Sequence, residues 1–471
     1  MASEQSADHR FKKPLKQWIK AFFWCLIYIL FIVWVDSYWW MLLLPLVFDG
    51  FITQYIPWTW WKKTKNKALL SFFSWVDAIG FALVAVYFIN NFLFQNYQIP
   101  SSSLEKSLLV GDFLLVSKAS YGPRIPNTPL SFPLVQHTFP LLNTKSYIEH
   151  PHWEYRRMKG FDTIKHNDIV VFNFPAGDTV AVNMPNPDYY WLCRYYGRDA
   201  VNSNKAQYGD IVYRPVDRRE NFVKRCVGLP GDWLTIKDNQ LYINGKAQEK
   251  FPGIQFNYFI QTDGTLIPED VLSDLNISNE DLKNGFFDNS NENTKANIAY
   301  FGFDPAKPLY LLPLTEEAFS KVKQLPYVKS LKIEPSFMGG DVYPLGWVKH
   351  WNRDNFGPLW IPKKGAKLLL TSANLPIYER VIKNYENNKL EVKDGVIYIN
   401  DQPAKTYTFK MDYYWMMGDN RHNSADSRSW GFVPEDHIVG RPVFVWLSLD
   451  KDKGLFNGKI RWNRFFKSAE R

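Results

Sequence analysis

The feature that most constrains this 471-residue chain is a set of three apolar segments within its first 94 residues. The segments cover residues 18–35, 38–58 and 72–94, and each is close to the ~20 residues that a helix needs to cross the hydrocarbon of a bilayer. A helix that is apolar all round must be buried in protein or lipid. Residues 1–95 are therefore predicted to form a membrane anchor with about three transmembrane helices.

The second apolar segment is the least regular of the three. Pro45, Asp49 and Gly50 lie inside it, and a carboxylate within a span is costly unless it faces another helix or water. We still expect residues 38–58 to cross the membrane. A re-entrant or interfacial segment is the alternative.

The distribution of lysines predicts how this anchor is oriented. The net charge is +9, and basic residues crowd the N-terminus and the loop after the second segment. Lysine-rich loops remain on the cytoplasmic side, so three spans place everything after Phe94 outside. We expect membrane lipid, and not nucleic acid, to be the partner of this charge. The lysines are Lys12, Lys13, Lys16 and Lys20 at the N-terminus, and Lys62, Lys63, Lys65 and Lys67 in the loop.

Beyond residue 95 the apolar residues occur in short β-rich runs, most of them bounded by turn residues. Such runs are typical of strands, so we predict a mainly β fold with an antiparallel core and few helices. The runs are 113–116, 169–174, 211–213, 233–236, 241–243, 396–399 and 443–447.

Two of these regions resemble each other. Residues 236–244 and 392–400 are identical at five of nine positions, and each has a turn signal in its middle. They are either a duplicated hairpin or the same hairpin chemistry used twice, and we prefer the second interpretation. Extending the alignment without gaps places Arg380 opposite Lys224.

Three motifs carry the candidate chemistry: IPSSSL at 99–104, FVKRCVGLPGD at 222–232 and MGDNRHNSADSR at 417–428. A serine hydroxyl is a poor nucleophile until a base accepts its proton, and a lysine can do so if burial lowers its pKa. In an extended segment, Ser101 and Ser103 would project to one face and Ser102 to the other.

Together the three motifs closely resemble the conserved boxes of type I signal peptidases, the membrane-bound serine proteases that remove signal peptides from exported proteins. The resemblance spans most of the chain beyond Gln95. It implies a multi-pass protein of the bacterial cytoplasmic (inner) membrane, with its catalytic domain on the outer (periplasmic) face and exported preproteins as substrates. No cofactor and no metal are expected, and the sequence contains no zinc spacing, Walker loop or dinucleotide fingerprint.

The resemblance also assigns roles to the first two motifs. In the family the nucleophile precedes an apolar residue, here Leu104, so Ser103 is the expected nucleophile. Ser101 falls where the family supplies a hydroxyl that helps the Ser103 N–H to stabilise the oxyanion. Lys224 is the expected general base, and Lys118 is the second choice.

The third motif matches the family almost without gaps. Ser424 is implied to hydrogen-bond the lysine and orient it, while Asp426 and Arg428 form a supporting ion pair. Asp419 and Asn420 are implied to hold the turn, and Gly418 is a further supporting residue.

Members of this family carry a variable second β domain between the two similar hairpins. The catalytic β domain is therefore predicted to comprise residues 96–250 and 378–471, with a long β-rich insert at 251–377. Inside the insert we expect short helices at 269–282 and 315–322 and a loop at 289–297.

The chain departs from the family pattern at four positions. Leu104 replaces methionine, Ser102 stands where glycine is frequent, and Asn167 stands where glycine is common. Lys106 stands where proline is usual, which raises the question of how the segment after the nucleophile is kept rigid.

Three other interpretations compete. His422 and His437 invite a Ser-His-Asp reading, but His422 occupies a variable position of the motif and no nucleophile-elbow sequence is present. The catalytic fold also resembles self-cleaving repressor proteases, which act in the cytosol and lack a membrane anchor. The alternative from another class is a catalytically inactive membrane scaffold that presents the insert to partners, against which the intact Ser103, Lys224 and Ser424 argue.

Overall fold

The computed structural model describes residues 11, 13–35, 38–346, 350–454 and 456–469, so Lys12 lies outside the described residues. The chain divides into two compact units. The first comprises Met1–Leu93 and Gly122–Phe161, and the second comprises Phe94–Tyr121 and Asp162–Arg471. The segment Gly122–Phe161 thus belongs with the apolar N-terminal helices, although it interrupts the sequence of the second unit.

Two helices of the first unit are long and apolar enough to cross a membrane. They are α2 (Leu15–Val35) and α4 (Lys67–Phe88), which a π-helical turn, Ile89–Leu93, extends. Between them lies a shorter apolar helix, Tyr38–Thr53, which includes α3 (Leu44–Phe48). It is roughly 25 Å long, slightly shorter than the ~30 Å hydrocarbon core.

The shorter helix runs back along α2, and its last turn begins at Asp49, whose carboxylate is hydrogen-bonded. Lys13 Nζ donates to Gln54 Oε1 (2.8 Å), which places the end of this helix beside the start of α2. The Asp49 carboxylate accepts hydrogen bonds from four donors, so its burial is compensated. Three spans therefore remain our prediction. The donors are the N–H groups of Tyr55 and Ile56, Trp58 Nε1 and Thr53 Oγ1.

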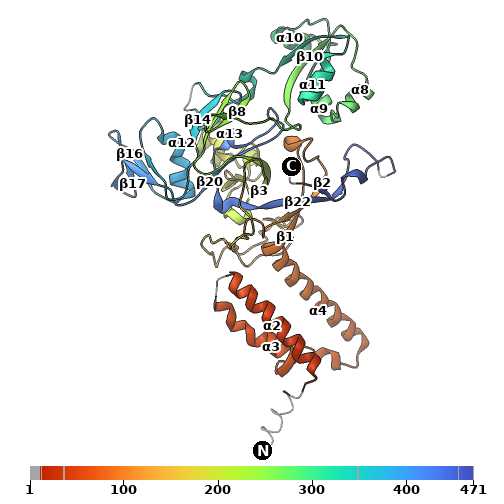
Figure 1. Ribbon diagram of the computed structural model, residues 1–471, viewed down its shortest axis with the longest axis vertical. Helices are drawn as coiled ribbons and strands as arrows, with labels where there is room; N and C mark the ends of the chain where they lie inside the picture. The colour runs from red at the N-terminus through yellow and green to blue at the C-terminus, as the bar shows by residue number, and fades with distance from the viewer. Residues whose placement is uncertain (1–10, 12, 36–37, 347–349, 455, 470–471) are drawn as a thin grey trace, which may run out of the picture. The chain divides into compact units, whose positions relative to one another are not determined.

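The second unit is built on an eight-stranded sheet, which confirms the predicted antiparallel β core (Figure 1). The strand order is β1-β2-β22-β3-β6-β20-β21, and β23 pairs with β22. Strands β2 and β22 come from opposite ends of the second unit and lie side by side. The bounds are β1 (Phe94–Gln98), β2 (Asp112–Ser117), β3 (Ile169–Asn173), β6 (Asn221–Gly228), β20 (Tyr413–Met417), β21 (Val433–Pro434), β22 (Ile438–Ser448) and β23 (Lys467–Ser468).

The central strand β3 is buried on both faces. Ile169 and Val171 pack into one apolar cluster, and Val170 and Phe172 pack into another. A continuous apolar run is what such a strand requires. Burial on both faces fixes the register with β6, because a one-residue slip would exchange its faces. In this register Val170 lies opposite Lys224.

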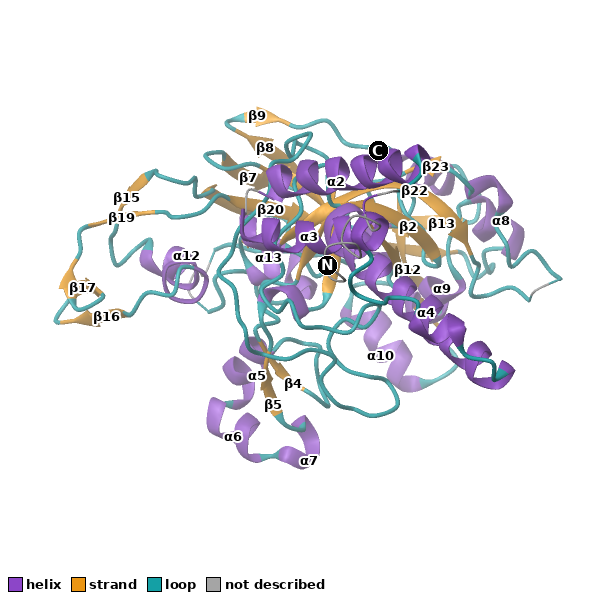
Figure 2. Ribbon diagram, turned by 90° about the horizontal axis from the view of Figure 1, so that it is seen from below, coloured by secondary structure: helices purple, strands orange, loops and turns teal. Residues whose placement is uncertain are grey.

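The two similar sequence segments form similar three-stranded meanders (Figure 2). The first turn of each contains two residues with positive φ, as a two-residue hairpin turn requires. The likeness does not extend to the lysine, since Arg380 ends the helix α12 (Leu375–Arg380) whereas Lys224 lies on a strand. The meanders are β7 (Trp233–Lys237), β8 (Gln240–Ile243) and β9 (Lys246–Ala247), and β16 (Leu390–Lys393), β17 (Val396–Ile399) and β18 (Gln402–Pro403).

Part of the predicted insert forms a sheet of its own, in the order β11-β12-β10-β13. The helix expected at 269–282 is divided in two, because Asn276 adopts a positive φ of 55° that interrupts it. The loop expected at 289–297 is wrong, because Asn291 caps a helix by accepting a hydrogen bond from the Thr294 N–H (2.8 Å). The elements are β10 (Phe256–Thr262), α8 (Glu269–Asp274), α9 (Asn279–Gly285), β11 (Phe286–Phe287), α10 (Glu292–Tyr300), β12 (Leu309–Leu314), α11 (Glu316–Lys323) and β13 (Val328–Ile333).

The remaining elements are short. They are β4 (Thr179–Ala181), α5 (Tyr189–Tyr196), α6 (Arg198–Ser203), α7 (Lys205–Tyr208), β5 (Ile211–Tyr213), β14 (Phe356–Trp360), β15 (Lys367–Leu369), β19 (Thr406–Thr408) and α13 (Ser427–Trp430).

Candidate active site

The candidate nucleophile lies on a single 3-10 turn, Ser102–Leu104, between β1 and β2. Leu104 anchors this turn, since it is 1% exposed and packs in the core beneath the sheet. The assumption of an extended serine run is therefore wrong from Ser102 onward, and only Ser101 keeps extended angles (φ −132°, ψ 158°). The alternation of side chains along an extended strand therefore cannot distinguish the hydroxyls of Ser101, Ser102 and Ser103. They are distinguished by their hydrogen bonds.

The hydroxyl of Ser103 shares a hydrogen bond with the amine of Lys224. Oγ and Nζ lie 2.6 Å apart, and the two residues are 7% and 4% exposed. Burial, opposed by the charges of Asp426 and Asp419, lowers the pKa of Lys224 from 10.5 to about 8. A neutral amine at this distance can accept the serine proton.

The residue after Lys224 ties the strand to the third motif. Arg225 donates from Nε and Nη2 to the two carboxylate oxygens of Asp419 (2.8 and 2.7 Å) in a buried bidentate pair. The N–H of Asn420, the next residue, donates to the Ser103 carbonyl (3.1 Å). The three motifs therefore meet around the Ser103–Lys224 pair.

A second buried ion pair supports the third motif from within. Nε and Nη2 of Arg428 lie 3.0 and 2.8 Å from the Asp426 carboxylate, which also accepts the Gly418 N–H (3.1 Å). Burial raises the pKa of Asp426, but the charge and hydrogen bonds of Arg428 outweigh it, so the net pKa is lowered. A Cβ on Gly418 would lie 2.2 Å from Ser424 Oγ and 2.7 Å from the Ser103 carbonyl oxygen, so only glycine fits.

The hydroxyls of Ser424 and Ser101 are expected to have catalytic roles, but their contacts are weaker than those of Ser103. Ser424 Oγ donates a long hydrogen bond (3.5 Å) to the Ala425 carbonyl, and within the described residues it shares none with Lys224. Ser101 is exposed, and its side chain makes no hydrogen bond to the turn that follows it. Contact with Gly418 nevertheless brings Ser424 to the side of the nucleophile, and both roles remain predictions.

A contact that the sequence does not reveal joins the start of the insert to the third motif. Gln255 makes two main-chain hydrogen bonds of 2.9 Å to the residues on either side of Asn420. Asn257 and Asn423 exchange side-chain amide hydrogen bonds in both directions (3.0 and 3.2 Å). Asn423 directly precedes Ser424, so strand β10 of the insert fixes the loop that is expected to orient the lysine.

The two histidines lie in ion clusters of a different kind. Nδ1 and Nε2 of His422 are 3.3 and 3.2 Å from the carboxylates of Glu334 and Asp354, and His437 contacts Asp436. Ser103, the candidate nucleophile, is hydrogen-bonded to Lys224 instead, which favours a lysine as general base over a Ser-His-Asp triad.

The question raised by Lys106 also has a structural answer. Lys106 has a φ of 73°, which the proline ring cannot adopt. Its Nζ donates to the Asn276 carbonyl of the insert. A hydrogen bond to the insert, and not a proline ring, therefore holds the segment after the nucleophile.

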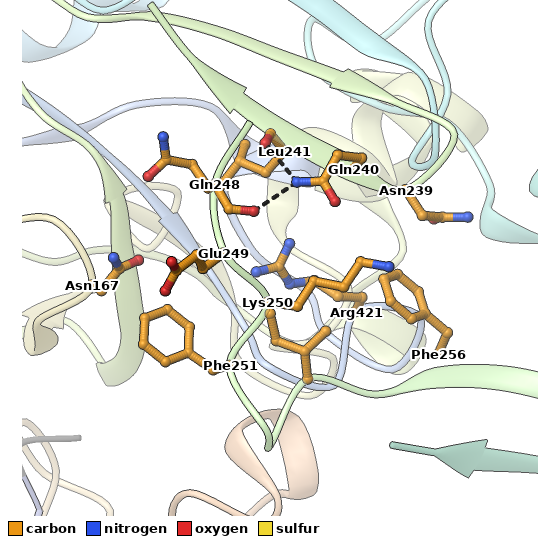
Figure 3. A pocket seen from close by; sticks show the side chains of 11 residues that line it. Asn167, Asn239, Gln240, Leu241, Gln248, Glu249, Lys250, Phe251, Phe256 and Arg421 are labelled. Atoms are coloured by element: carbon orange, nitrogen blue, oxygen red, sulfur yellow. Dashed lines mark hydrogen bonds between the residues drawn. The ribbon is translucent and has the colours of Figure 1, made fainter. Parts of the chain in front are cut away.

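A small pocket opens beside the third motif (Figure 3). Arg421 and Lys250 line it, and Gln240 Nε2 donates to the carbonyls of Gln248 and Leu241 (2.7 and 3.0 Å) at its edge. Ser103 and Lys224 are not among its lining residues, so the pocket is separate from the candidate catalytic pair. In the part of the chain that the structure describes, no group of three His, Cys, Asp or Glu side chains could hold a metal ion.

Comparison with known proteins decides the family. The sequence model described as "Signal peptidase, peptidase S26" matches residues 72–264 and 404–447, which together make up half of the chain. The chain belongs to the signal peptidase family. The matched regions contain all three motifs and the strands that carry them.

Curated members of the family show how the similarity is distributed. A signal peptidase I of Buchnera aphidicola subsp. Acyrthosiphon pisum is 26% identical over 415 residues, covering 86% of this chain and 83% of the relative. Signal peptidase I of Pseudomonas aeruginosa is 27% identical over 378 residues, covering 78% and 69%. That of Haemophilus influenzae is 49% identical over 53 residues, covering 11% and 15%. Weak similarity thus extends over most of the chain, and strong similarity is confined to short stretches.

The amide pair between the insert and the third motif gives the first prediction. Asn257→Ala removes both side-chain hydrogen bonds to Asn423 and a third to Glu334 Oε2 (2.9 Å), but leaves the main-chain pairing of Gln255. Each bond to Asn423 contributes about 1 kcal/mol, so we expect kcat for preprotein cleavage to fall by up to roughly 30-fold, with little change in KM. Asn297→Ala, at an exposed position of α10, is the matched control and should leave kcat unchanged. Wild-type kcat in Asn257→Ala would show that the pair does not position the loop.

Proposed function

We propose that the protein is a signal peptidase I, an endopeptidase that removes N-terminal signal peptides from exported preproteins and cleaves after small residues. The observation that carries this proposal is the buried hydrogen bond between Ser103 Oγ and Lys224 Nζ (2.6 Å). Family membership supports it, and the curated relatives are named signal peptidase I. The preference for small residues rests on the family resemblance.

In the proposed reaction, neutral Lys224 takes the proton of the Ser103 hydroxyl as Oγ attacks the scissile carbonyl carbon. The Ser103 N–H and the Ser101 hydroxyl would stabilise the resulting oxyanion. The C–N bond then breaks, and Lys224 returns the proton to the leaving amine of the mature protein. A water molecule next gives a proton to Lys224 and attacks the acyl carbon. The bond between this carbon and Ser103 Oγ then breaks, Lys224 returns the proton to Oγ, and the signal peptide leaves with a new carboxylate.

The other site residues act through the lysine and the loop. Ser424 would orient the amine by a hydrogen bond, as the family resemblance implies. Asp426 with Arg428, and Asp419 with Arg225, would hold the loop that carries Ser424, and Gly418 would allow its close approach to the nucleophile. These are positioning residues, since none of them exchanges the serine proton.

The proposed location is the cytoplasmic membrane of a bacterium, with three spans and the catalytic domain on the outer face. The lysine distribution supports this orientation, and two helices are long enough to cross. Strand β1 begins directly after the last turn of α4, so a short tether would keep the site near the membrane.

An inactive membrane scaffold is the competing proposal. A scaffold has no use for a buried amine with a lowered pKa beside a hydroxyl, and both groups are present. A β-lactam-like or penem probe that forms a covalent adduct with the purified protein would argue against the scaffold.

The serine assignments give the second prediction. Ser103→Ala should abolish processing of a model preprotein, because among the described residues the Ser103 hydroxyl is the one that is hydrogen-bonded to Lys224. Ser101→Ala should reduce turnover by roughly 10²-fold, the usual effect of losing one oxyanion donor, and Ser102→Ala should be mild. If Ser102→Ala proved to be the inactive variant, the nucleophile would be misassigned.

The third prediction concerns pH. Only the neutral amine of Lys224 can accept a proton, so cleavage should rise with pH, with its midpoint near the lowered pKa of about 8. Lys224→Arg should be inactive, because a guanidinium stays protonated, while Lys118→Arg should remain active. The measurement is the pH dependence of initial rates, with circular dichroism to verify folding. Near-normal cleavage by a folded Lys224→Arg enzyme would rule out the lysine as base.

The fourth prediction is topological. Single cysteines at Ala2, Asn66 and Asn239, in a background without native cysteines, are tested with a membrane-impermeant thiol reagent on intact cells. Only Asn239 should react, because the lysine-rich N-terminus and the lysine-rich loop remain inside. Labelling at Ala2 would show that two spans, not three, carry the catalytic domain.

A further inference from the structure

The segment Gly122–Phe161 of the first unit is a long, irregular hairpin. At its base the Ile125 N–H donates to the Arg156 carbonyl (2.9 Å), and near its tip the Phe139 N–H donates to the Thr144 carbonyl (2.9 Å). The chain therefore travels outward, turns at residues 140–143 and returns along itself.

The tip and one arm of this hairpin expose large apolar side chains. Leu141 and Leu142 at the tip are 96% and 70% exposed, and Leu134 is 76% exposed. Leu130 and Ile148, which face each other across the arms, are 52% and 61% exposed. Single exposed leucines are ordinary, but a set of this kind in one segment indicates a surface that is covered in the functional protein.

The base of the hairpin is fixed to the ends of two apolar helices (Figure 1). Val35, the last residue of α2, packs with Phe92 and Met158, and its carbonyl accepts a hydrogen bond from Arg156 Nη2 (3.0 Å). Trp34 Nε1 donates to the Lys159 carbonyl (3.3 Å). The hairpin thus starts where α2 ends and where α4 also ends.

From this level one arm passes back along α4. Tyr87 Oη donates to the Pro129 carbonyl (2.7 Å), and Tyr87 lies about 7.5 Å further into the helix than Phe92 at 1.5 Å per residue. The apolar segment that ends at Phe94 contains the polar pair Asn90 and Asn91 close to its end, and tyrosines near such ends lie at the membrane–water interface. The arm that carries Leu130 is therefore held at interfacial depth.

The charge of the segment fits the same surroundings. Residues 122–161 contain five Lys or Arg and two Asp or Glu, and an excess of basic residues next to a membrane attracts anionic lipid headgroups. Apolar side chains at interfacial depth together with basic residues match a lipid interface.

We propose that the hairpin of residues 122–161 is a second lipid anchor, seated in the outer leaflet with Leu141 and Leu142 at the boundary between headgroups and acyl chains. This proposal rests on the membrane topology of the proposed function and does not depend on proteolysis. The hairpin would hold the outer ends of α2 and α4 at a fixed depth in the bilayer.

The test places an environment-sensitive nitrobenzoxadiazole probe on Leu141→Cys in the full chain without native cysteines, reconstituted in vesicles of phosphatidylethanolamine and phosphatidylglycerol. We expect a blue-shifted emission that is quenched by lipids with a nitroxide high on the acyl chain, and less by a nitroxide near the chain end. The control is the same probe on Tyr300→Cys, a 76% exposed position on α10, which should show neither effect. A second variant, Leu142→Asp with the probe on Leu141→Cys, should lose most of the quenching.

Two outcomes would overturn the proposal. Equal spectra at the two probe positions would show that the tip stays in water or adsorbs without specificity. A blue shift at Leu141→Cys without lipid quenching would show that a protein, such as a second copy of this chain, covers the tip. The readout does not involve cleavage, so an inactive enzyme with normal quenching would contradict the proposed function and leave the lipid anchor standing.

Discussion

In the proposed mechanism, an uncharged lysine beside a serine hydroxyl is the condition on which the rest of the site depends. With a pKa of about 8, roughly a tenth of the amines are neutral at pH 7, compared with about 0.03% for an ordinary lysine. Burial thus enlarges the competent fraction by roughly 300-fold. The central strands supply that burial, because their register places Lys224 within the sheet opposite Val170.

The two buried carboxylates create a conflict that the structure resolves. Asp419 and Asp426 each favour the charged form of Lys224, and unpaired they would oppose catalysis. Each forms a bidentate pair with its own arginine, Arg225 or Arg428. Breaking such a buried pair by removing one partner typically costs about 3–5 kcal/mol. The pairs therefore hold the loop in place while much of the carboxylate charge is neutralised.

Much of the fold could be predicted from local patterns, because strands and hairpin turns have short-range signals. The antiparallel core and the turns of the two meanders are of this kind. The turn at Ser102 and the helix α10 were mispredicted, because the first depends on the anchoring of Leu104 in the core and the second on a single cap at Asn291.

The parts of the site that could not be predicted involve residues far apart in sequence. The motifs indicate Ser103 and Lys224 only through the family resemblance, since no local pattern joins residues 121 positions apart. The pair Asn257–Asn423 spans 166 positions between two domains of the predicted scheme. The place of the segment Gly122–Phe161 beside the N-terminal helices was likewise hidden, because packing and not sequence order decides it.

The most direct test of the central claim is a titration of the Lys224 amine by NMR in the full chain with isotope-labelled lysine. The signal is assigned by its absence in Lys224→Arg. The account predicts a pKa near 8, well below 10.5. A pKa at or above 10 in the folded protein would show that the amine stays protonated at working pH, and the Ser103–Lys224 mechanism would then be wrong.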